Sequence, residues 1–77
     1  MAAAYILIEL TGGKAKGAFK KIKAIKGIEC VSAVTGPYDA IAYAEAKDIN
    51  QLGDMVVSKV RAVNGVSKTI TCVAVEL

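Results

Sequence analysis

The stretch IECVSAVTGPYDAIAYAEA, residues 28–46, decides the fold of this chain. Segments rich in Val, Ile, Tyr and Ala lie on either side of the pair Gly36-Pro37, and each is long enough to form a strand. Because Gly and Pro together favour a turn, the pattern predicts a tight hairpin between strands over Ile28–Thr35 and Tyr38–Ala46.

A segment with helical periodicity lies on each side of this hairpin. In the first, over residues 14–26, apolar residues recur at the spacing of one helix face, and Gly27 follows as a stop signal. In the second, Asp48 is expected to cap the helix and Gln51 to bond back to the cap. Gly65 is expected to end this second helix.

Two more strands are predicted, over Ala3–Leu10 and Val66–Glu76, so that the element order is β-α-β-β-α-β. The two halves also match at a shift of 38 residues, which aligns Ala4-Tyr5 with Ala42-Tyr43. Two fused βαβ units with right-handed crossovers predict an α+β, ferredoxin-like fold. Its four-stranded antiparallel sheet has the order 4-1-3-2 and carries both helices on one face.

The composition indicates one small domain that is richer in apolar residues than its own core can hold. The chain has 77 residues, of which 55% are hydrophobic and 22% charged, and its mean hydropathy is +0.47. This composition excludes intrinsic disorder, and no apolar run approaches the roughly 20 residues of a membrane helix. We therefore expect a single domain over residues 1–77, located in the cytoplasm and without membrane contact.

Both faces of the predicted sheet are apolar. Alternation along the strands directs one set of side chains away from the helices, where a sheet that faces water would be polar. Seven residues form this second face: Tyr5, Leu7, Ile41, Tyr43, Ile70, Cys72 and Ala74. Because monomers rarely tolerate an exposed apolar patch of this size, we expect the sheets of two copies to pack face to face in a homodimer.

The two cysteines, Cys30 and Cys72, are expected to be free and buried. In the order 4-1-3-2 they belong to opposite edge strands, which excludes a disulfide within the chain. The chain has no histidine and no paired thiols, so we expect neither a metal site nor a cofactor. Without histidine or a nucleophile motif, an enzyme is not expected either.

Positive charge is concentrated in the first predicted helix. Six of the ten basic residues lie in residues 14–26 with no acid between them, whereas the rest of the chain has a net charge of −3. The only aromatic residue in this segment is Phe19, and arginine is absent, which argues against membrane insertion or specific recognition. We interpret the lysines as a solvated outer face, and the preceding Gly12-Gly13 as a flexible turn rather than a phosphate cradle.

Asp39 gives the predicted turn its chemistry. Gly36 can adopt a positive φ and present its N–H, and Pro37 stiffens the turn. An amino acid could place its ammonium group on Asp39 and its carboxylate on backbone N–H groups around Gly36. The simpler alternative is a hairpin in which Asp39 only accepts a hydrogen bond from a nearby backbone N–H.

The chain resembles the effector-binding domain of the Lrp/AsnC family of transcription regulators over about residues 3–77. The resemblance rests on the element order, the stop at Gly27, the run over residues 34–39 and the ending over residues 71–76. It implies dimerisation through the sheet, rings of dimers (octamers or decamers) and small amino-acid-like effectors bound between dimers. It also implies the residues that line the effector site: Gly36, Pro37, Tyr38 and Asp39, with Thr71 and Cys72 on the last strand.

Full-length members of this family place a helix-turn-helix domain before this one, whereas here the first strand starts almost at once. We therefore expect effector sensing without direct DNA binding, and a partner that is a second copy or a full-length Lrp/AsnC regulator. Two alternatives stay open. An ACT-like amino-acid-binding module would place its ligand near Gly12-Gly13, and a small ferredoxin-like monooxygenase is disfavoured by the lack of histidine.

Overall fold

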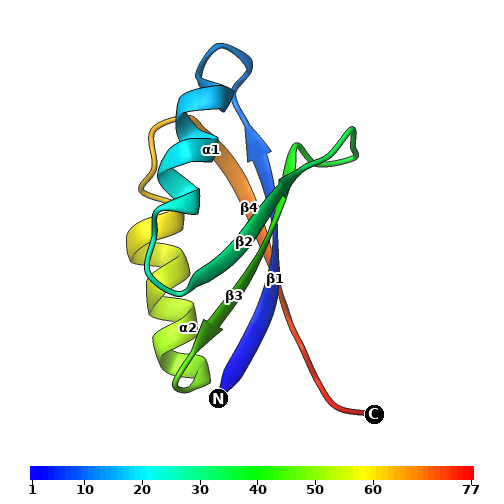
Figure 1. Cartoon of the computed structure of the whole chain (residues 1–77), viewed down its shortest axis with the longest axis vertical. Coiled ribbons are helices and arrows are strands. Elements are labelled where there is room, and N and C mark those ends of the chain that lie inside the picture. The colour runs from blue at the N-terminus through cyan, green and yellow to red at the C-terminus, as the bar shows by residue number, and fades with distance from the viewer.

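The computed structural model describes all 77 residues and has the predicted ferredoxin-like architecture (Figure 1). Its elements are β1 (Ala2–Leu10), a 3₁₀ turn η1 (Gly12–Lys14), α1 (Ala15–Lys23), β2 (Ile28–Ala33), β3 (Ala40–Ala46), α2 (Ile49–Met55), its π-helical continuation η2 (Val56–Val60) and β4 (Val66–Val73). The strands form one antiparallel sheet of order β2-β3-β1-β4, which is the predicted order counted from the other edge. Both helices lie on one side of it (Figure 1), and none of the helical segments is long and apolar enough to span a bilayer.

The core lies between the sheet and the helices, because alternate strand residues point to that side. Ile6 and Ile8 of β1 are fully buried there and lie opposite alanines of β3. The helical layer contributes Ile22, Leu52 and Val60, which are also inaccessible to solvent. The buried side of β3 consists of three alanines: Ala40, Ala42 and Ala44. Their small side chains allow the helical layer to approach the sheet closely.

Both helices bury most of their predicted apolar faces, although Ile49, predicted on the buried face of the second helix, is 58% exposed. The details of the helix ends also differ from the prediction. Asp48 caps α2, since its Oδ1 accepts a hydrogen bond of 2.8 Å from the Gln51 N–H, whereas the return bond from the Gln51 side chain is not formed. Helix α1 ends four residues before Gly27, because the next two N–H groups bond three residues back and tighten the last turn. Gly27, with a φ of 102°, then turns the chain into β2.

The tight hairpin predicted between β2 and β3 is wrong. β2 ends two residues earlier than predicted, and β3 begins two residues later. Residues 34–39 therefore form a loop that projects from the end of the sheet (Figure 1). A two-residue turn of type I′ at Gly36-Pro37 is excluded, because it requires a positive φ at both residues and the ring of Pro37 fixes its φ at about −65°. The Val34 N–H closes the loop by donating to the carbonyl oxygen of Asp39 at 3.0 Å, and Gly36 takes a φ of 150°.

Strand β4 is also shorter than predicted and ends at Val73 instead of Glu76. The last bond on this side runs from the Ala74 N–H to the carbonyl oxygen of Ala3, at 2.8 Å. The register therefore places the end of β4 beside the first residues of β1, so the residues after Ala74 have no strand to pair with.

The side of the sheet away from the helices, here called the open face, is apolar as predicted. It consists of the seven predicted residues Tyr5, Leu7, Ile41, Tyr43, Ile70, Cys72 and Ala74, together with Cys30 and Ser32 of β2. One row, Cys30-Tyr43-Tyr5-Cys72, crosses all four strands, and its two tyrosine ring centroids lie 5.1 Å apart. Both thiols are free and lie on opposite edge strands, as predicted. Their predicted burial is wrong, because nothing within the chain covers this face.

The turn at Gly65 generates a prediction for stability. Gly65 has a φ of 108°, and an added Cβ would lie 3.0 Å from the Lys14 Cβ and 3.1 Å from the Ala18 Cβ. Gly65→Ala should therefore lower the free energy of unfolding by about 1–3 kcal/mol. The matched control is Gly53→Ala, in α2, where no atom lies within 4 Å of the added Cβ.

At Gly53 the alanine should instead raise the free energy of unfolding by about 0.5–1 kcal/mol, because it restricts the unfolded chain and favours helix. Urea unfolding at one fixed protein concentration measures both changes. Equal effects of the two substitutions would contradict the role assigned to Gly65.

Candidate functional site

Asp39 is anchored by three hydrogen bonds directly before β3. Its N–H donates to the carbonyl oxygen of Ile8 at 3.0 Å, and its own carbonyl oxygen accepts from the Val34 N–H. Its carboxylate Oδ2 accepts a bond of 2.8 Å from the Leu10 N–H, which ties the 34–39 loop to the end of β1. The carboxylate thus has the structural role of the simpler alternative, as acceptor of a backbone N–H.

Most of the acceptor capacity of this carboxylate stays open. Asp39 is exposed, and the Leu10 N–H is the only hydrogen-bond donor on its carboxylate. Because an ionised carboxylate has about four acceptor positions, a ligand can bond to it without displacing the Leu10 N–H. The group is therefore both fixed in place and available.

A hollow of about 380 Å³ lies beside Asp39. It is lined by Leu10 of β1, Ala15, Lys16 and Phe19 of α1, Ala33 of β2, and Asp39 itself. The lining is mainly apolar and carries two opposite charges, the ammonium group of Lys16 and the carboxylate of Asp39. Its volume is within the range of about 300–1,000 Å³ that is usual for small-molecule sites.

Within one chain, the structure brings only Asp39 of the predicted ligand-binding residues to this hollow. Gly36 and Pro37 are exposed in the 34–39 loop, and no atom lies within 4 Å of where a Gly36 Cβ would be. Tyr38 is half-buried. These three residues are neighbours of Asp39 in the chain but do not line the hollow.

Thr71 and Cys72, the other predicted ligand-binding residues, lie on β4. They pair with Ile6 and Tyr5 of β1, so β1 separates them from β3 and from the 34–39 loop. Cys72 belongs to the open face and Thr71 to the opposite side of its strand. No single-chain site contains both Asp39 and this part of β4.

Five residues of the hollow were not identified as site residues from the sequence: Leu10, Ala15, Lys16, Phe19 and Ala33. The spacing of three residues places Lys16 and Phe19 as neighbours on one helix face. Nothing in the sequence, however, shows that this face meets the 34–39 loop. That proximity arises from the packing of α1 against β2, which is a long-range contact.

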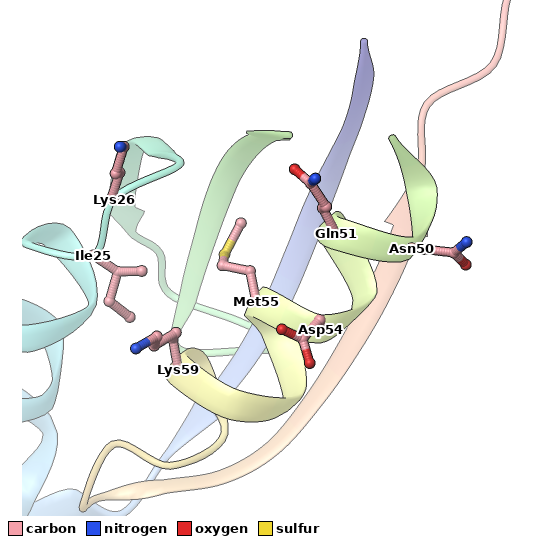
Figure 2. Close-up of a pocket in the computed structure, with 7 residues that line it drawn as sticks. All are labelled: Ile25, Lys26, Asn50, Gln51, Asp54, Met55 and Lys59. Atoms are coloured by element: carbon pink, nitrogen blue, oxygen red, sulfur yellow. The ribbon is translucent and has the colours of Figure 1, made fainter. Parts of the chain in front are cut away.

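A larger hollow, of about 780 Å³, lies between the end of α1 and α2 (Figure 2). Its floor is formed by the half-buried Ile25 and Met55. Its remaining lining is polar or charged: Lys26, Asn50, Gln51, Asp54 and Lys59. Figure 2 shows these side chains spread around Met55 rather than directed at one point. Because polar groups in ligand sites usually converge, we take the hollow beside Asp39 as the candidate site.

Gly12 and Gly13, the glycines of the ACT-like alternative, form the exposed η1 turn. The Lys14 N–H closes this turn on the carbonyl oxygen of Thr11 at 2.9 Å. Neither glycine lines one of the four hollows of the structure.

On the open face, Tyr43 makes a fixed polar contact. The Tyr43 Oη donates to the Oε2 of Glu45 at 3.0 Å. This hydrogen bond raises the pKa of Tyr43 above its usual value, and desolvation and the negative charge of Glu45 add to the effect. Loss of the phenol proton would place two negative charges side by side at the rim of an apolar surface.

Comparison with known proteins bears on the whole chain. The family model of the Lrp/AsnC ligand binding domain matches residues 3–77. The solved structure of TTHA0845 from Thermus thermophilus is 31% identical, with a TM-score of 0.93 over 100% of this chain and 96% of that one. AsnC from E. coli is 17% identical and has the same fold, with a TM-score of 0.90 over 99% of this chain and 52% of AsnC.

Parts of longer proteins also match. The feast or famine regulatory protein Rv3291c from M. tuberculosis, solved in complex with L-methionine, is 17% identical, with a TM-score of 0.83 over 100% of this chain and 52% of that one. The homocitrate synthase of Sulfurisphaera tokodaii is 38% identical over 52 residues, which are 68% of this chain but only 11% of the enzyme. The family match over nearly the whole length, together with the shared fold, shows that this chain belongs to the Lrp/AsnC ligand-binding domain family.

Proposed function

We propose that this chain senses a small amino-acid-like effector and acts, without catalysis, as an oligomerisation module linked to transcription regulation. The observation that carries the proposal is the carboxylate of Asp39. It is fixed by the Leu10 N–H, yet it keeps acceptor positions open beside a hollow of about 380 Å³. A carboxylate that is already fixed binds an ammonium group without first losing side-chain freedom, which favours affinity.

Structural neighbours support an amino acid as the effector class. Rv3291c and the regulator NMB0573 from Neisseria meningitidis were both solved with L-methionine. Both have the fold of this chain, with TM-scores of 0.83 and 0.80. An amino acid carries the ammonium group that complements Asp39, so we assign that contact to the effector.

The remaining predicted ligand-binding residues fit a site that two chains share. Gly36, Pro37 and Tyr38 lie next to Asp39 but outside the hollow, where a neighbouring chain has access to them. Thr71 and Cys72 can reach an effector at this loop only from another chain, because β1 lies between β4 and β3. We therefore place the effector between dimers.

We assign the open face to the dimer interface. Tyr5 is 50% exposed and Ile70 is 37% exposed in the isolated chain, which is unfavourable for such large apolar side chains. Packing of two sheets would bury about 800 Å² per chain, the area of a standard interface. In this proposal the dimers assemble into octameric or decameric rings, and full-length Lrp/AsnC regulators are alternative partners for the same face.

The match to homocitrate synthase favours a second setting for the same sensing function. The matched segment is only 11% of the enzyme, so it is a minor part of an enzyme otherwise unrelated to this chain. In this second setting, the domain responds to its effector on behalf of an enzyme rather than a transcription regulator.

The first prediction for function concerns Asp39. Asp39→Ala should weaken amino acid binding roughly tenfold to a hundredfold, because it removes a charge-assisted hydrogen bond. Asp39→Asn keeps an oxygen for the Leu10 N–H, so it should lose affinity with little loss of stability. The matched control is Asp54→Ala, which removes an exposed carboxylate from α2 and should bind normally.

A thermal-shift screen of the twenty amino acids, followed by calorimetry on those that bind, measures these effects. If no amino acid stabilises the unmodified protein, the sensing function is wrong. If binding survives both substitutions of Asp39, the effector lies elsewhere, and Gly12-Gly13 of the ACT-like alternative is the next place to test.

The second prediction concerns the open face. Leu7→Asp should dissociate the dimer, because it places a charge between Ile41 and Ile70 in the middle of an apolar interface. Val57→Asp makes the same change at a residue that is 59% exposed on the helical side and should leave the dimer intact. Light scattering separates the 8.0 kDa chain from its dimer. An unmodified protein that is a folded monomer at micromolar concentration would rule out this interface.

The third prediction concerns alkaline pH. The bond to Glu45 raises the pKa of Tyr43 within the single chain, so Tyr43 stays neutral at a pH at which an ordinary tyrosine, with a pKa of about 10, begins to ionise. Burial of an ionised Tyr43 beside the Glu45 carboxylate in the interface would be unfavourable, so assembly should weaken as the pH rises through this raised pKa. Sedimentation at increasing pH should therefore show dissociation, and Tyr43→Phe should remove that step. An identical pH profile for Tyr43→Phe would show that other groups cause the dissociation.

A further inference from the structure

The hollow beside Asp39 contains one lysine that differs in its surroundings from the other lysines of α1. Lys16 lines the hollow together with Phe19, three residues further along the same helix face. Lys20 is exposed on the same helix but lines none of the hollows. Lys14 lies in η1 and donates to the Oδ1 of Asn64 at 3.4 Å. Lys16 is therefore the lysine of this helix that a ligand in the hollow would meet.

The two charges of the hollow do not neutralise each other. The carboxylate of Asp39 accepts a hydrogen bond only from the Leu10 N–H, so the Lys16 ammonium is not bonded to it. Lys16 comes from α1 and Asp39 from the 34–39 loop, so the two charges enter the hollow from separate elements. A ligand with both an ammonium and a carboxylate group can pair with each of them.

Between these charges the lining is apolar. The side chains of Leu10, Ala15, Phe19 and Ala33 are hydrocarbon. Phe19 is half-buried and packs against the core, so its ring is held in position. A ligand side chain that is apolar would bury its surface here at a gain of about 25 cal/mol per Å². A charged side chain would be desolvated without a partner.

We propose that Lys16 binds the carboxylate of the effector and that the apolar lining selects amino acids with aliphatic, thioether or aromatic side chains. This inference rests on the proposed function, because it assumes that an amino acid binds beside Asp39. It differs from the expectation that backbone N–H groups around Gly36 receive the carboxylate, since Gly36 does not line the hollow. The ammonium group of the effector stays on Asp39.

The test uses ligand analogues that lack one charge. The probes are L-methionine, L-leucine and L-phenylalanine, and for the one that binds most tightly, its amide and its N-acetyl derivative. The amide lacks the carboxylate and should bind the unmodified protein at least roughly tenfold more weakly, because the charge-assisted bond to Lys16 is lost. The N-acetyl derivative lacks the ammonium group and should be weakened in the same way through Asp39.

Lys16→Gln should bind the amino acid and its amide about equally, which removes the preference for the free carboxylate. Its preference for the free amine over the N-acetyl derivative should remain. Asp39→Asn should lose the preference for the free amine and keep the preference for the free carboxylate. Lys20→Gln is the matched control, since it removes the same charge from the same helix without touching the hollow. Lys16 is exposed, so thermal unfolding without ligand should be unchanged in both lysine variants.

The outcomes separate this inference from the proposed function. If amino acids bind but Lys16→Gln keeps the full preference for the free carboxylate, Lys16 does not bind the carboxylate of the effector and the sensing function stands. If the tightest ligands of the unmodified protein are charged amino acids, the apolar selection is wrong. If no amino acid binds the unmodified protein at all, both the inference and the proposed function fail.

Discussion

Close packing of the helical layer on the alanine-lined side of β3 determines where the other elements lie. Ala40, Ala42 and Ala44 are completely buried and leave little depth between sheet and helices. The larger side chains of the core come from β1 and the helices, and burial of each contributes about 1.5–3 kcal/mol. Because strand residues alternate, fixing the alanines inward forces Ile41 and Tyr43 outward. The apolar open face is thus a direct consequence of how the core is built.

A different helix–sheet contact creates the candidate site. Helix α1 packs against β2, and this places Lys16 and Phe19 near the end of β1 and the 34–39 loop. Asp39 then has two roles, since one of its oxygens holds Leu10 while the rest of the carboxylate faces the hollow. In the proposed function the same side chain also binds the effector, so that the site would be ordered before a ligand arrives.

Features that depend on neighbours in sequence could be predicted, whereas features that depend on packing could not. The element order, the Asp48 cap and the membership of the open face follow from local periodicity and from the alternation of strands. The length of the 34–39 loop was mispredicted, because a Gly-Pro pair signals a turn but not where the ladder stops. The lining of the hollow was missed for a different reason. Lys16 and Asp39 are brought together by the contact between a helix and a loop, for which the sequence holds no periodic signal.

The row Cys30-Tyr43-Tyr5-Cys72 has a consequence for oxidation chemistry. Sheets that pack face to face lie about 10 Å apart, whereas a disulfide requires Cα atoms within about 7 Å. A disulfide across such an interface therefore requires two cysteines that lie directly opposite each other and draw the two backbones together, as in the inter-sheet disulfide of immunoglobulin domains. Cys30 and Cys72 lie on the edge strands, where the twist of each sheet increases the distance between the sheets and disfavours such a link. Cys30 and Cys72 would then act as small apolar side chains at the two margins of the interface. The stability of the proposed dimer would then come from the apolar side chains that it buries and not from a covalent link between its chains.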